Sequence, residues 1–119
     1  MTIDRYGLVR APGRPVMSLG IARGDWVTVC LTAQNRPAGI ASQTQQIFDL
    51  FDDYLARAGT DKSRLLTAQV WLRDMADYDA MNAVWNRWID HANPPVRSCM
   101  RANMARPDTL IEIRITAAR

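Results

Sequence analysis

The fold follows first from residues 42–72, which read SQTQQIFDLFDDYLARAGTDKSRLLTAQVWL. Over residues 47–58 the apolar side chains recur at spacings of three and four, the period of one face of an α-helix. Ser42 and Gln45 match a capping box at the helix start, and Gly59 stands where a C-terminal cap glycine belongs. The pattern therefore predicts an amphipathic helix, whose apolar face carries Ile47, Leu50, Phe51, Tyr54, Leu55 and Ala58.

The end of the same stretch changes period. Residues 66–72 alternate between apolar and more polar side chains, which is typical of a strand with one buried face. Asp77 then stands at the start of a second helical pattern, and Pro94-Pro95 is expected to end it. The apolar face of this second helix carries Tyr78, Met81, Val84, Trp85, Trp88 and Ile89.

Shorter strands flank this centre on both sides. Upstream, residues 14–23 and 27–29 alternate around the turn Arg23-Gly24-Asp25, which predicts a β-hairpin. Downstream, residues 96–102 and 109–117 predict two strands, separated by the turn residues Arg106-Pro107-Asp108. The element order is then β-β-α-β-α-β-β, an α+β fold in which residues 1–119 form a single domain.

Two amphipathic helices can cover only one face of a single mixed sheet. The other face is expected to carry Trp71 and Leu110, whose full exposure to water is unfavourable. An uncovered face of this kind predicts self-association. The residues alone indicate an oligomer and do not fix its number of copies.

The composition argues against several classes of partner. Of the 15 basic residues, 14 are arginines scattered along the chain, whereas a nucleic-acid surface clusters them. No apolar run is long enough for a membrane span. Cys30 and Cys99, with no signal peptide in view, are expected to be reduced thiols of a cytoplasmic protein. His91 is the only histidine, so neither a metal site nor another cofactor is expected.

The residues that could carry chemistry lie in the last two strands. Arg97 is flanked by small side chains, and its guanidinium offers a planar fork that matches a carboxylate. Glu112 interrupts an isoleucine-rich strand. If the two strands pair as a hairpin around Arg106-Pro107, Glu112 lies opposite Arg101, and Arg97 lies farther along the same face. The alternative is an ordinary ion pair between Glu112 and Arg101, with Arg97 on the surface.

Five short motifs resemble those of the YjgF/RidA (reactive intermediate deaminase) family, which has also carried the label endoribonuclease L-PSP. Each motif is short, but the five occur in the family's order and spacing over about residues 14–118, and their elements agree with the order predicted above. In chain order they are Gln43-Thr44-Gln45-Gln46, Leu72-Arg73-Asp74-Met75-Ala76-Asp77, Met81-Asn82-Ala83-Val84-Trp85, Pro95-Val96-Arg97-Ser98 and Ile111-Glu112-Ile113.

The resemblance implies a chorismate-mutase-like fold, a homotrimer, and clefts between subunits that hold a small carboxylate or imino acid. It also implies hydrolysis of 2-imino or enamine acids to 2-keto acids and ammonia, as in 2-iminobutanoate/2-iminopropanoate deaminases. By position, Arg97 would bind the carboxylate, Glu112 would orient or deprotonate a water, and Asn82 and Cys99 would line the pocket. An imine is already electrophilic, so the site needs only orientation, a placed water and proton transfer.

Two positions depart from the family's pattern. Met17 stands where the family has a tyrosine, and Leu31 follows Cys30 where the family has a glycine, so these three residues are expected at the pocket wall. The bulk of Leu31 either closes part of the pocket or changes the backbone path. Two other functions therefore stay open: a non-catalytic trimer that binds small carboxylates and, with less support, an endoribonuclease.

Overall fold

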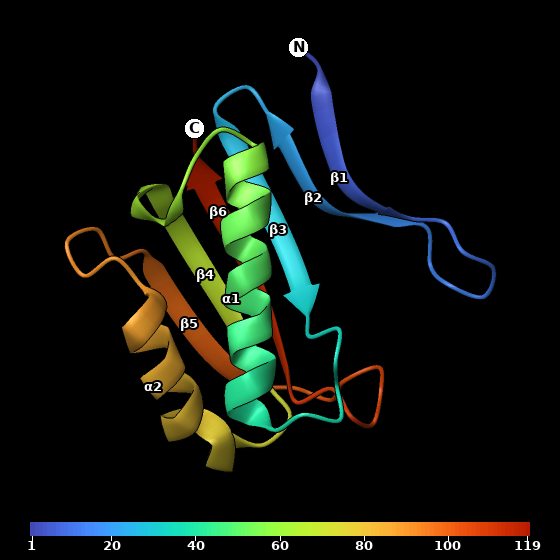
Figure 1. Cartoon of the computed structure of the whole chain (residues 1–119), viewed down its shortest axis with the longest axis vertical. Coiled ribbons are helices and arrows are strands. Elements are labelled where there is room, and N and C mark those ends of the chain that lie inside the picture. Colours follow the sequence, from blue (N-terminus) through green and yellow to red (C-terminus); the bar gives the residue numbers. More distant parts are fainter.

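Six strands and two α-helices follow one another along residues 1–119, all of which the computed structural model describes. Two short 3-10 helices, η1 (Lys62–Arg64) and η2 (Met75–Asp77), precede β4 and α2. The strands form one sheet in the order β1-β2-β3-β6-β4-β5 (Figure 1). The elements are β1 (Ile3–Val9), β2 (Met17–Arg23), β3 (Trp26–Thr32), α1 (Ile40–Arg57), β4 (Leu65–Leu72), α2 (Tyr78–Trp88), β5 (Val96–Arg101) and β6 (Ile111–Ala118).

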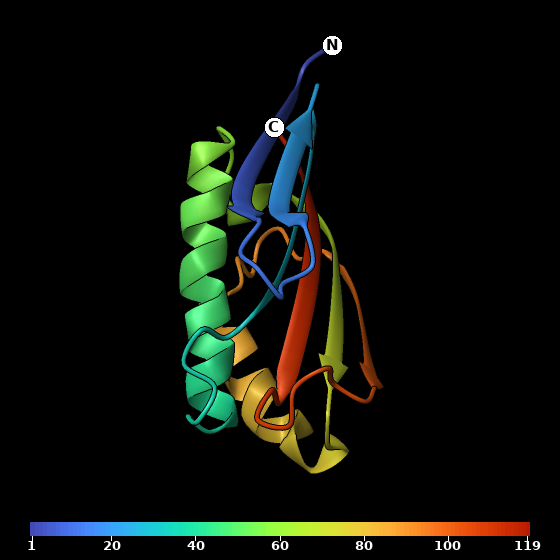
Figure 2. The ribbon, with the colours of Figure 1, turned by 90° about the vertical axis from the view of Figure 1, so that its right-hand side faces the viewer.

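Both helices pack on one face of the sheet and leave the other face open (Figure 2). The covered face is the one that carries the apolar side chains of β3 and β6. Val29 and Ile113 are buried beneath the helices, while their sequence neighbours point to the open face. Between the helices, Phe48 of α1 stacks on Trp88 of α2 with ring centroids 4.3 Å apart. The predicted α+β architecture, with two helices on one face of a mixed sheet, is confirmed.

The first strand, β1, was missed from the sequence. It pairs antiparallel with β2 at the edge of the sheet, so the observed order begins with three strands and not two. Its side chains do not alternate cleanly, since Ile3 and Leu8 are both largely exposed. Gly7 adopts a φ of 63°, which interrupts the regular strand pattern. An exposed and interrupted edge strand gives little periodic signal.

The last two strands do not pair as the hairpin that the sequence left open. β6 lies inside the sheet, antiparallel to both β3 and β4, while β5 pairs in parallel with β4 at the far edge. Residues 102–110 therefore carry the chain past the end of β4 instead of folding β6 back onto β5. Glu112 lies opposite Trp71 and Thr32, so it forms no pair with Arg101.

The helix ends also differ in part from the prediction. α1 begins at Ile40 with Gly39 as its cap residue, so Ser42 lies within the first turn and does not cap the helix. α2 ends at Trp88, well before Pro94-Pro95, because Ile89 is already extended. Gly59, with a φ of 83°, follows the end of α1 as predicted. No helix combines the length and apolar character needed to cross a membrane.

Candidate functional site

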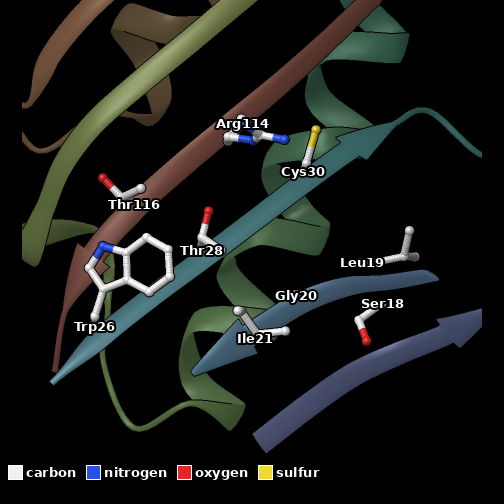
Figure 3. Close-up of a pocket in the computed structure, with 9 residues that line it drawn as sticks. All are labelled: Ser18, Leu19, Gly20, Ile21, Trp26, Thr28, Cys30, Arg114 and Thr116. Carbon is white, nitrogen blue, oxygen red and sulfur yellow. The ribbon is translucent and has the colours of Figure 1, made fainter. Parts of the chain in front are cut away.

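The open face of the sheet carries polar and charged side chains where β3 meets β6. Cys30 projects from β3 and Arg114 from the neighbouring β6, on the side away from α1 (Figure 3). Thr28 and Trp26 continue the row on β3 and line a shallow hollow of about 420 Å³ together with these two residues. No helix of the chain covers this surface, which therefore stays available to a ligand or to another subunit.

A second hollow of about 460 Å³, which we call the Glu112 groove, adjoins the first at Cys30 and Arg114. Met17 at the start of β2 and Glu112 near the start of β6 form part of its wall. The groove lies where the connections of residues 10–16, 33–39 and 102–110 reach the same end of the sheet. Three of the predicted pocket residues, Met17, Cys30 and Glu112, are thus together in one place.

Cys30 acts as a hydrogen-bond donor in this groove. Its Sγ donates to Glu112 Oε2 over 3.2 Å. Burial, the hydrogen bond to Glu112 and the negative charge of Glu112 together raise the pKa of the thiol to about 12, against a smaller opposing effect of Arg114. The thiol therefore keeps its proton at neutral pH and is not an activated nucleophile.

Arg97 is held in a different place, against α2. It lies opposite Ala68 in the register of β4 and β5, so its side chain points to the helix-covered face. Its Nη1 donates to Asn82 Oδ1 over 2.8 Å. Its guanidinium carbon lies 5.1 Å from the centre of the Trp85 ring and 5.9 Å from that of Tyr78, within the range of cation–π contact. None of the ion pairs of the chain includes Arg97, so its guanidinium has no carboxylate partner within the chain.

Cys99 belongs to the same group, which we call the Arg97 cluster: Arg97, Cys99, Asn82, Tyr78 and Trp85. Cys99 lies opposite Val70 on the helix-covered face and packs against the core. Burial raises the pKa of its thiol, and the positive charge of Arg97 offsets part of that rise. Like Cys30, it is a protonated side chain and forms a wall of the cluster.

Leu31 lies apart from both groups. It alternates with Cys30, points to the helix-covered face, and is 4% exposed within the core. Its side chain therefore does not fill the Glu112 groove. It borders a third hollow, between the β1–β2 hairpin and α1, that shares Met17 with the groove.

Apart from Leu31, the predicted residues thus form two groups on opposite faces of the sheet. Arg97 and Glu112 cannot reach one ligand within a single chain, because β5 is an edge strand whose Arg97 faces α2 while Glu112 faces the open side. The alternative in which Arg97 is an ordinary surface arginine also fails, since its guanidinium is half-buried and fixed by Asn82.

Sequence reasoning missed the arginines of the Glu112 groove, which are Arg14, Arg36, Arg106 and Arg114. Along the chain they are isolated, and the turn residues near Arg106 indicated only a change of direction. The one clue in the sequence was that three of these arginines lie in connections between elements. That these connections come together can be recognised only when the strand order is known. Tyr78 and Trp85 were predicted as core residues of α2, and their contact with Arg97 was also missed.

Comparisons with known proteins agree with the fold and the motifs. The model of the family described as "Endoribonuclease L-PSP" matches residues 24–119. The crystal structure of NMB1025 from Neisseria meningitidis, a member of the YjgF protein family, superimposes with a TM-score of 0.87 at 33% identity, and the alignment covers 100% of this chain and 96% of that one.

Two curated proteins carry related names. A "RutC family protein" of Haemophilus ducreyi is 49% identical over 76 residues, which are 64% of this chain and 65% of that protein. The "3-aminoacrylate deaminase RutC" of Acinetobacter baylyi is 33% identical over 73 residues, which are 61% of this chain and 57% of that protein. The match thus spans slightly less than two thirds of the length of the Haemophilus ducreyi relative.

Proposed function

This chain belongs to the endoribonuclease L-PSP family, with relatives in the YjgF and RutC groups, and on that premise we propose that it hydrolyses reactive 2-imino (enamine) acids to 2-keto acids and ammonia. The reaction takes place in clefts between the subunits of a homotrimer. One observation carries the proposal: Arg97 presents a half-buried guanidinium, fixed by Asn82 at 2.8 Å, that has no acidic partner in its own chain.

The separation of the two groups supports an assembly. Arg97 lies at the β5 edge and Glu112 on the open face, so a second copy is needed to bring both to one ligand. Because two different surfaces meet, the contact is head-to-tail, and such a contact forms a ring when its rotation closes. A ring of three follows the family resemblance. Val96 and Met100, which are 75% and 51% exposed on the uncovered side of β5, would be covered by the neighbouring copy.

Each group then has a role in the reaction. Arg97 binds the substrate carboxylate through its two-pronged fork, and Asn82, Trp85 and Tyr78 hold that fork in place. Glu112 of the next subunit positions the attacking water through the carboxylate oxygen that Cys30 leaves free. Water adds to the C=N carbon and one of its protons passes to the nitrogen, which gives a carbinolamine. The hydroxyl proton of the carbinolamine then passes to the nitrogen as the C–N bond breaks, which releases ammonia and leaves the C=O of the keto acid.

The two departures from the family pattern are compatible with this reaction. Met17 cannot donate a proton, so the proposal assigns it only a place in the groove wall. Leu31 packs in the core, which supports an open groove. We place the reaction in the cytoplasm as part of the same proposal, because Cys30 and Cys99 are free thiols.

Keto-acid release from freshly generated 2-iminopropionate and 2-iminobutyrate tests the proposal. We expect purified protein to accelerate release above the spontaneous rate and Arg97→Ala to remove the acceleration. Arg64→Gln, which removes an exposed arginine that takes part in no ion pair, is the matched control and should retain the activity. Release at the spontaneous rate with every amino-acid-derived imine would falsify the proposal.

A non-catalytic trimer that binds small carboxylates is the second candidate. The observation in its favour is that Glu112 is the only carboxylate in the wall of the groove, with the neutral side chain of Met17 beside it. Keto acids would then raise the melting temperature without any turnover of imines. Ribonuclease activity is not proposed, since His91 is exposed in the turn after α2 and is bound to the Asn86 carbonyl.

A further inference from the structure

The wall of the Glu112 groove holds more positive charge than one carboxylate can balance. Four guanidinium groups line it, and Glu112 is the only acidic side chain among the lining residues. Of the four, Arg36 pairs with Asp108 over 3.2 Å. Arg14, Arg106 and Arg114 form no ion pair anywhere in the chain. Three unpaired guanidinium groups thus converge on one hollow of about 460 Å³.

This convergence depends on a buried side chain. Gln43 is fully buried in α1, and its Nε2 donates to the carbonyls of Ala38 and Asp108, each at 2.9 Å, and to that of Arg36. Its Oε1 accepts from the amide of Leu110 over 3.0 Å. One amide therefore ties the connection that carries Arg36 to the connection that carries Arg106, and the two run side by side in Figure 1.

Arg73 fixes the same connection from the other side. Its Nε donates to the Thr109 carbonyl over 2.9 Å, and its Nη2 donates to the Arg106 carbonyl. The guanidinium of Arg73 thus donates to backbone carbonyl oxygens, and Arg73 does not line the groove. The backbone at Arg106 is therefore held in place before any ligand binds, as expected of a preorganised binding site.

A second negative charge on the ligand fits this arrangement. Several guanidinium groups at the wall of one cleft focus a positive potential into it, and a neighbouring subunit that excludes water strengthens that potential. A substrate with a single carboxylate, bound by Arg97 of the adjacent copy, leaves the arginines of the groove unused. The fork geometry of arginine matches carboxylates and phosphates equally well.

We propose that the imino acids accepted by this site carry a second anionic group, a carboxylate or a phosphate, which the arginines of the Glu112 groove bind. This inference rests on the proposed function for the identity of the site. It adds the substrate class: dicarboxylic or phosphorylated 2-imino acids in preference to those with apolar side chains.

Calorimetric binding of three keto-acid products tests the inference: pyruvate, oxaloacetate for a second carboxylate, and 3-phosphohydroxypyruvate for a phosphate. At low salt we expect at least one of the doubly anionic ligands to bind about tenfold more tightly than pyruvate. That ratio should fall with rising salt. Equal affinity for all three ligands overturns the inference.

Single variants locate the preference. Arg106→Gln and Arg114→Gln should each lower the ratio of doubly anionic to pyruvate affinity by about threefold or more, whereas Arg64→Gln removes the same charge elsewhere and should keep the ratio. All three positions are exposed, so the variants are expected to fold, and a melting curve checks this. A ratio that neither groove variant changes overturns the assignment.

The same ligands separate this inference from the proposed function. Tight binding of doubly anionic keto acids without turnover of any imine refutes the deaminase and supports the ligand class. Faster turnover of the alanine-derived imine than of the aspartate-derived imine, together with equal binding of the products, refutes the ligand class and supports the deaminase.

Discussion

The hydrogen bond between Cys30 and Glu112 shows how burial sets the chemistry of a single residue in the groove. The thiol projects from β3 and is partly buried, so desolvation disfavours the thiolate, and it donates a hydrogen bond to Glu112 Oε2 3.2 Å away. A cysteine in this state positions its neighbour and does not attack a substrate. In the proposed reaction, Glu112 and not Cys30 is therefore the reactive group of the groove.

The raised pKa of Cys30 makes stability depend on pH on the alkaline side. The folded thiol titrates at about 12 and the ordinary thiol at 9.0, so the unfolded chain loses this proton first. The contribution of Cys30 to the free energy of unfolding should be constant below about pH 9 and should fall as the pH rises from about 9 towards 12. Urea denaturation at about pH 8 and pH 10.5 measures this decline.

Cys30→Ser removes the titrating group and should therefore show a shallower decline than the natural chain. All other titratable groups are the same in both proteins, so the difference between the two declines isolates Cys30. Parallel declines would show that the folded thiol titrates normally.

At the scale of elements, Gln43 joins the start of α1 to two connections. Gln43→Leu should lower the free energy of unfolding by about 2–4 kcal/mol, because it leaves buried carbonyls and the Leu110 amide without partners. Gln45→Leu is the matched control: its side chain is exposed, bonds only to Asp49, and should change stability by less than about 0.5 kcal/mol. Similar losses in both variants would show that Gln43 has no special role.

The elements themselves could be predicted where a single segment contains its own signal. The apolar stripe of α1 and the alternation of β4 each reflect one buried face, and Gly24 marks a two-residue turn between β2 and β3. Strand partners depend on contacts between distant segments. Arg106-Pro107-Asp108 does form a turn, but no local pattern shows that the chain then passes β4 before β6 begins.

The sequence singled out individual residues of the candidate site but did not predict how they are arranged. The motifs singled out Arg97, Asn82 and Glu112, and Arg97 does contact Asn82. The hairpin hypothesis placed Arg97 and Glu112 on one face, whereas the parallel pairing of β5 turns Arg97 towards α2. The groove arginines could not be found, because their proximity results from the tertiary fold alone.

At the scale of the whole molecule, the uncovered face of the sheet leaves large apolar side chains exposed to water. Trp26, Leu66 and Met100 are each more than 40% exposed on a chain whose helices cover only the other side. Burial of such side chains between copies stabilises an assembly by roughly 25 cal/mol for each Å² of apolar surface removed from water. The same contact would bring the Arg97 cluster of one copy to the Glu112 groove of the next.

Met100→Asp tests the assembly. We expect light scattering to give the natural chain a mass three times the 13.4 kDa of one copy and the variant a lower mass, because a carboxylate in the contact is costly to bury. Met75→Asp changes an exposed methionine in the short helix before α2 and should leave the mass unchanged. A natural chain that remains at 13.4 kDa at high concentration would rule the trimer out.

The most direct measurement mixes two inactive variants. Arg97→Ala and Glu112→Gln should each abolish imine hydrolysis alone, because every site lacks one of its two groups. Co-expressed in equal amounts, the two chains should recover about a quarter of the natural activity, since one site in four then combines Arg97 from one copy with Glu112 from the next. No recovery in verified mixed assemblies would mean that both groups must come from one chain, contrary to their positions on opposite faces of the sheet.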